Sequence, residues 1–121
     1  MRLKMALFWA VLIAVVHAIS GDDLSLIYLD DLFSLDKLFH LLVFAIGAWL
    51  LIPIVLHQCT KHAYLYIFIV YAFYGLALEL MQGAFFEGRC TSFLDWLADI
   101  LGVLTAILIH KKIYPKEIIK S

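Results

Sequence analysis

The feature that most constrains this chain is a series of four apolar runs separated by short polar segments. The runs cover about residues 4–20, 36–57, 62–82 and 92–111. A bilayer core of about 30 Å is crossed by roughly 17–25 helical residues. The middle two runs reach that length easily, the fourth reaches it once its ends are included, and the first is marginal. Lipid offers no hydrogen-bond partner to an open backbone, so each run has to be helical. The sequence therefore predicts an all-α fold: an integral membrane bundle of four transmembrane helices, in a single domain covering residues 1–121.

Composition excludes a water-soluble domain. Hydrophobic residues make up 65% of the chain, and the mean hydropathy is +1.00, whereas a soluble domain is about 45–50% apolar. A net charge of −1 gives no basis for a nucleic-acid partner. The two cysteines, Cys59 and Cys90, do not have a metal-binding spacing. Membrane lipids are the partners that this composition predicts.

The first apolar run has a second interpretation. Arg2 and Lys4 precede it, and the small residues Ala18, Ser20 and Gly21 follow it, as in a secretory signal with a cleavage site. The other three runs make the chain a membrane protein in either case. We therefore prefer an uncleaved first helix and keep the signal as the alternative.

The basic residues predict the orientation in the membrane. They flank the start of the first run, the second connection and the end of the fourth run: Arg2, Lys4, Lys61, Lys111, Lys112, Lys116 and Lys120. The positive-inside rule then places both termini and the second connection in the cytoplasm. Cys59 is predicted on the cytoplasmic side and Cys90 on the outer side. Residues 24–33, in the acidic first connection, are predicted to form a short helix at the outer interface.

Polar residues within the runs gather in the outer half of the membrane. They open the second and fourth runs and close the third: Asp36, Lys37, His40, Glu79, Gln82, Ser92, Asp95 and Asp99, with Arg89 just before the fourth run. Apart from Lys37 and Arg89, their spacings of three and four residues place those of each run on one helix face. Ionisable groups inside spans are costly and usually face the bundle interior. We therefore expect them to form one shared site.

Structural explanations compete with a functional one. Ser92 and Asp95 form a capping box before an apolar run, and Ser34 is placed to cap the second run. His40 alone could be an interhelical hydrogen-bonding residue. Glu79 and Asp99 are the hardest to explain structurally, because neither sits where its own helix needs a cap. Three glycines are most simply close-packing positions between helices: Gly75, Gly83 and Gly102.

Three motifs carry a family resemblance. They are Asp36-Lys37-x-x-His40, then Glu79-x-x-Gln82, then Gly88-Arg89-x-x-Ser92-x-x-Asp95-x-x-x-Asp99-x-x-Gly102. Together they resemble the VanZ-like family of bacterial membrane proteins. The resemblance implies a multi-pass protein of the bacterial cytoplasmic membrane and a link to resistance against the glycopeptide teicoplanin. Asp99 departs from the pattern, because asparagine is commoner at this position in the family.

Three functions are compatible with the cluster. The first is an enzyme acting on a lipid-linked or cell-envelope substrate at the outer leaflet, with His40 as base or nucleophile oriented by Asp36. Glu79 and Asp95 join these two as catalytic candidates. The substrate-binding candidates are Arg89 and Lys37, which would hold a phosphate or carboxylate, together with Gln82, Ser92 and Asp99.

The second function is non-catalytic binding of a lipid headgroup or antibiotic, and the third is a purely structural polar network. A metal site at His40 with the acids is a further alternative, but the spacing matches no established metal motif, so no metal ligands are assigned. The sequence identifies no cofactor. This region has four carboxyl groups and fewer basic side chains to balance their charge. Some of the carboxyl groups must therefore be protonated, paired or bound to a cation.

Overall fold

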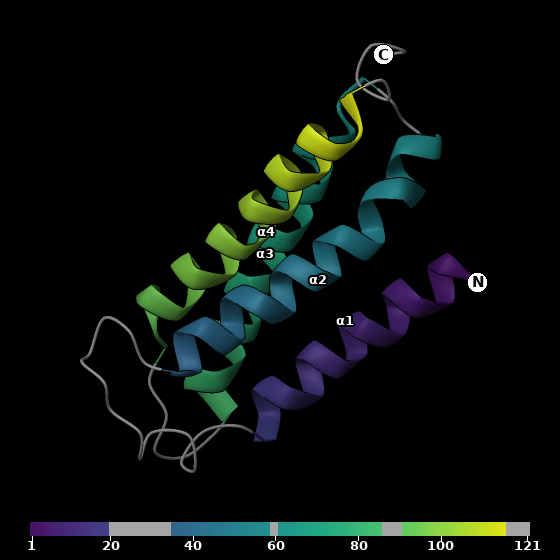
Figure 1. Cartoon of the computed structure of the whole chain (residues 1–121). Coiled ribbons are helices and arrows are strands. Elements are labelled where there is room, and N and C mark those ends of the chain that lie inside the picture. The colour runs from purple at the N-terminus through teal and green to yellow at the C-terminus, as the bar shows by residue number, and fades with distance from the viewer. Residues whose placement is uncertain (20–34, 59–60, 86–90, 116–121) are drawn as a thin grey trace.

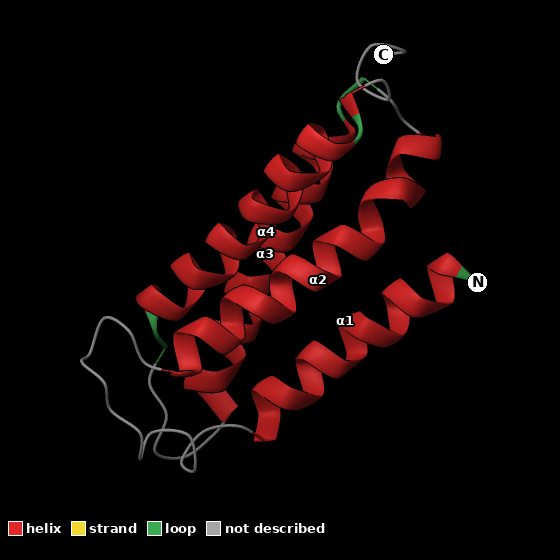
Figure 2. Ribbon diagram, in the orientation of Figure 1, coloured by secondary structure: helices red, strands yellow, loops and turns green. Residues whose placement is uncertain are grey.

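The computed structural model describes residues 1–19, 35–58, 61–85 and 91–115, and these form four α-helices (Figures 1 and 2). The helices are α1 (Arg2–Ile19), α2 (Leu35–Gln58), α3 (Ala63–Phe85) and α4 (Phe93–Ile113). Every boundary lies within three residues of the predicted one. The predicted interfacial helix at residues 24–33 lies outside the described residues.

The helices run alternately in opposite directions (Figure 1). The end of α1, the start of α2, the end of α3 and the start of α4 therefore meet at one end of the bundle, at the lower left of Figure 1. We call this the polar end, and the other the opposite end. The order of the helices thus brings the three sequence motifs to the same end of the molecule.

The surface of the bundle is largely apolar. Large side chains project outward from every helix, including Phe8, Leu42, Phe73, Leu101 and Leu108. Three helices, α2, α3 and α4, are long and apolar enough to cross a membrane. The prediction of a membrane protein is therefore supported for three of its four helices, and a membrane crossing by α1 stays a prediction.

The α2 and α4 helices form the most extensive pair in the bundle. Gly102 explains how closely they approach, because a Cβ atom there would collide with the backbone carbonyl of Leu41. Backbone atoms cannot move aside as a flexible side chain can. Gly102 is therefore a close-packing position, as the sequence predicted.

Side chains of three residues hold α1 against the bundle. The Trp9 indole donates a hydrogen bond to the Val43 carbonyl at 2.9 Å, and the Tyr74 hydroxyl donates to the carbonyl of Ala10. The Gln82 amide donates to the His17 carbonyl at 2.7 Å. These bonds attach α1 to both α2 and α3.

Candidate functional site

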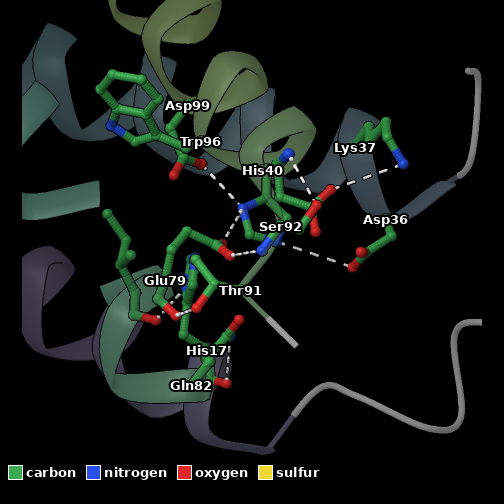
Figure 3. A network of polar contacts seen from close by, with 12 residues as sticks. His17, Asp36, Lys37, His40, Glu79, Gln82, Thr91, Ser92, Trp96 and Asp99 are labelled. Atoms are coloured by element: carbon green, nitrogen blue, oxygen red, sulfur yellow. Dashed lines mark hydrogen bonds and ion pairs between the residues drawn. The ribbon is translucent and has the colours of Figure 1, made fainter. Parts of the chain in front are cut away.

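A cluster of polar side chains lies inside the polar end, with contributions from all four helices (Figure 3). Its innermost members are His17 on α1, His40 on α2, Glu79 on α3 and Asp99 on α4, all of which are buried. Glu79 and Asp99 have no exposed surface at all. This part of the molecule is therefore polar and ionisable inside and apolar outside, as is expected of a bundle surrounded by lipid.

His40 is the centre of the cluster. Its Nδ1 lies 2.9 Å from Asp99 Oδ1, within hydrogen-bonding distance. Its Nδ1 is also 3.9 Å from Glu79 Oε1, and its Nε2 is 3.9 Å from Asp36 Oδ1. One imidazole is thus surrounded by carboxylates from three helices.

The sequence predicted that Asp36 orients His40, but the residue that accepts a direct hydrogen bond from the His40 ring is Asp99. The i, i+4 spacing does bring Asp36 close, although 3.9 Å is too long for a hydrogen bond. Asp99 is 59 positions away from His40 in the chain. Only the packing of α4 on α2 brings the two side chains together.

Glu79 connects α3 to the first residues of α4. Its Oε2 accepts a hydrogen bond from the backbone N–H of Ser92 at 3.1 Å, and its backbone carbonyl accepts from Thr91 Oγ1 at 3.4 Å. Ser92 is the N-cap of α4, and its hydroxyl accepts from the Asp95 N–H at 3.3 Å. This confirms the cap by Ser92, but the reciprocal acceptor of the predicted capping box is Glu79 in place of Asp95. Glu79 also satisfies an amide at this helix start, a structural role that the sequence analysis did not recognise.

The Asp99 carboxylate occupies space that a glycine leaves open. A Cβ atom at Gly75 would lie 2.8 Å from Asp99 Oδ2 and 3.2 Å from Phe44 Cε1. Any larger residue at position 75 would therefore push the carboxylate away from His40. The close-packing role predicted for Gly75 is thus specific to the site.

His17 is the member of the cluster that the sequence analysis missed. Its ring makes an edge-to-face contact with the His40 ring, with centroids 4.5 Å apart. Its Nδ1 lies 2.8 Å from the Ile13 carbonyl, which accepts but cannot donate, so Nδ1 carries the proton. Its place in the sequence could have indicated this membership. His17 lies near the end of the first run, at the predicted depth of the other polar residues.

Asp36, Lys37 and Asp95 form a more exposed rim around the cluster. Lys37 Nζ lies 3.7 Å from Asp95 Oδ1, and these side chains are 23% and 14% exposed. The Asp36 side chain is 35% exposed. The rim is thus the more exposed side of the cluster, and its Asp36 lies on the side of His40 Nε2.

The structure therefore brings together most of the residues chosen from the sequence. His40, Asp36, Glu79 and Asp99 lie in direct or near contact, and Lys37, Asp95, Ser92 and Gln82 lie around them. Gln82 binds the α1 backbone, which is a structural role. Arg89 lies outside the described residues.

A pocket of about 400 Å³ lies at the opposite end of the bundle. Its lining combines the start of α1 with residues of α2 and α4, including Arg2, Trp49, Pro53 and His110. His110 has a partner of its own there, since its Nδ1 lies 3.1 Å from the Tyr64 hydroxyl. This pocket shares no residue with the polar cluster and is therefore separate from the candidate site.

Comparisons with protein-family models, with curated proteins and with solved structures give no match to this chain.

Proposed function

We propose that this protein is a VanZ-like, multi-pass protein of the bacterial cytoplasmic membrane whose polar end faces outward and acts on a lipid-linked or cell-envelope substrate. The observation that carries the proposal is the buried His40–Asp99 pair, with Glu79 beside it, inside an apolar bundle. Buried ionisable groups are costly in a membrane protein and are commonly retained for function. The three sequence motifs support the family, and the distribution of basic residues supports the orientation.

His40 has the geometry of an oriented general base. When Nδ1 donates to Asp99, the neutral ring carries its lone pair on Nε2. That nitrogen lies toward Asp36 and the exposed rim, where a substrate hydroxyl or a water molecule would reach it. The arrangement follows the usual logic of a histidine held in one tautomer by a carboxylate.

Lys37 supplies the positive charge for a substrate headgroup. Of the Lys and Arg residues that the structure describes, it is the one at the polar end, and it contacts Asp95 at 3.7 Å. A phosphate or carboxylate at the rim would compete with Asp95 for this ammonium group. Arg89, which precedes α4, is the second candidate for the same task.

A non-catalytic binding function is the second candidate. It is favoured by the full burial of Glu79 and Asp99, which a substrate could reach only if the helices moved apart. In this case the rim would bind a headgroup or an antibiotic, while the buried residues would hold the rim in place.

The test expresses wild-type protein, His40→Asn and Glu79→Gln at equal membrane abundance in a teicoplanin-susceptible bacterium. The readouts are the minimum inhibitory concentration of teicoplanin and the envelope lipids, measured by mass spectrometry. We expect the wild type to raise resistance and change the abundance of a lipid-linked precursor, and both variants to lose both effects. A resistance effect with unchanged lipids would favour the binding function.

The matched control is His110→Asn, which alters a buried histidine at the opposite end. We expect it to retain the wild-type effects. If His40→Asn also retained them, or if the wild type had none, the proposed function would be wrong.

A further inference from the structure

We propose that His17, His40, Glu79 and Asp99 bind a divalent transition-metal ion at the centre of the polar end. Each of these four residues offers one ligand atom, and all four atoms lie within 4.8 Å of one another. Each comes from a different helix (Figure 3). The inference goes beyond the proposed function, because metal binding does not require that a substrate be converted.

The distances suit one shared ion. Ligand atoms about 2.0–2.2 Å from a zinc ion lie roughly 3–4 Å from each other in a tetrahedral site. His40 Nδ1 lies 2.9 Å from Asp99 Oδ1 and 3.9 Å from Glu79 Oε1. Small side-chain rotations are therefore enough to place these three atoms around an ion.

Two carboxylate oxygens point to a missing partner. Glu79 Oε1 and Asp99 Oδ2 are fully buried, and neither has a hydrogen-bond partner among the described residues. A buried carboxylate oxygen without a partner is costly. An ion bound by these two residues would give Glu79 Oε1 a direct partner and would neutralise the charge that Asp99 Oδ2 shares with Oδ1.

The charge balance also favours a cation. Glu79 and Asp99 are both buried, while the described Lys37 contacts Asp95 at the rim. A divalent cation would neutralise both buried carboxylates, which two neutral histidines cannot do.

The histidines are oriented as metal ligands usually are. The Nδ1–H of His17 donates to the Ile13 carbonyl, which leaves Nε2 with the lone pair. A ligating histidine commonly donates its other N–H to a carbonyl or carboxylate in this way. If Nδ1 of His40 binds the ion, its Nε2–H is on the side of Asp36 Oδ1, which lies 3.9 Å away and could orient the ring only after moving closer.

The donor set narrows the choice of ion. Two imidazoles and two carboxylates without a thiolate suit Zn²⁺, Fe²⁺ or Mn²⁺ rather than a copper(I) site. An ion bound here would also change the chemistry of the site, because His40 would then be a ligand. With all four side chains bound, the ion would have a structural role; a water molecule could be activated there only if one of the four ligands left the ion.

The experiment uses the full-length protein, purified in detergent and stripped of metal with a chelator. Co²⁺ serves as the probe, because its visible absorption reports ligand geometry, and Zn²⁺ is added as a competitor. We expect one Co²⁺ to bind per chain and to be displaced by Zn²⁺. His17→Gln and Glu79→Gln should each weaken binding by at least about 100-fold, since even an outer-shell partner is worth 10–100-fold.

Two controls separate this site from other histidines. His110→Gln alters a buried histidine at the opposite end, and the double variant His57→Gln/His62→Gln removes two exposed histidines. Both should bind Co²⁺ as the wild type does. Loss of binding in the double variant with retention in His17→Gln would overturn the inference, and so would a wild type with no saturable binding.

A measurement on the wild type tests the site even if the variants fail to fold. The X-ray absorption spectrum of the Zn²⁺-loaded protein should show nitrogen and oxygen ligands with the outer scattering of two imidazoles. A spectrum without imidazole would overturn the site. These readouts need no substrate, so the two proposals are tested separately. Metal binding can be absent while the teicoplanin effect is present, and metal binding can be present while the teicoplanin effect is absent.

Discussion

His40 and Asp99 determine the character of the polar end at the scale of single residues. Both are buried, and they share a hydrogen bond of 2.9 Å between α2 and α4. Gly75 leaves the space that the Asp99 carboxylate fills. A change at any of these positions therefore alters both the charge and the packing of the site.

Asp99→Asn tests which of these two properties matters for stability. The asparagine oxygen can still accept from His40 Nδ1, while one buried charge is removed. In metal-free protein we expect an unfolding temperature in detergent equal to or above that of the wild type. Asp99→Ala should instead lower the free energy of unfolding by about 1–3 kcal/mol, because His40 loses its partner.

Comparing the stabilities of the two variants shows whether the charge of Asp99 stabilises the fold. If Asp99→Asn destabilised the protein as much as Asp99→Ala, the carboxylate charge itself would stabilise the fold. The polar cluster would then be structural, and the argument for a retained functional charge would be wrong.

Among the helix pairs, α2 and α4 make the closest contact. Gly102 faces the Leu41 carbonyl without any intervening side chain. The same pair of helices carries His40 and Asp99, so the spacing of the helices sets the length of that hydrogen bond. Packing and site chemistry are thus coupled through one glycine.

Gly102→Ala should separate α2 from α4 at the level of the site. Overpacking of this kind costs about 1–3 kcal/mol, so we expect a lower unfolding temperature in detergent and weaker Co²⁺ binding. Leu101→Ala on the same helix, where the side chain is 55% exposed, should leave both values near those of the wild type. Wild-type stability of Gly102→Ala would contradict the close approach of the two backbones.

The whole molecule has an apolar exterior and a polar end, and this determines how it sits in a bilayer. Large apolar side chains cover the outside of all four helices, whereas ionisable groups gather inside one end. The basic residues predict that this end faces outward. Access to the site from the periplasm or the cell exterior depends on that orientation.

Cysteine labelling in intact cells tests the orientation. A membrane-impermeant maleimide should modify Cys90 and spare Cys59, because the predicted topology places them on opposite sides of the membrane. Both cysteines should react after the membrane is permeabilised, which controls for reactivity. The reverse pattern in intact cells would place the polar end in the cytoplasm and remove the basis for an outer-leaflet substrate.

The sequence by itself determined the helices and the end at which polar residues gather. Apolar run length and the need for internal backbone hydrogen bonds in lipid are local properties, so the boundaries of α1 to α4 were predicted closely. The cap formed by Ser92 was predictable for the same reason, since it depends on a spacing of three residues.

Only the tertiary structure decided which side chains meet. The helices are apolar on most sides, so periodicity does not indicate how each is rotated about its axis. The contacts of His40 with Asp99, of Glu79 with the Ser92 amide and of His17 with His40 all join different helices. The His40–Asp99 contact also depends on the close approach of two backbones at Gly102 and on the space left by Gly75, which are properties of helix pairs rather than of any one segment.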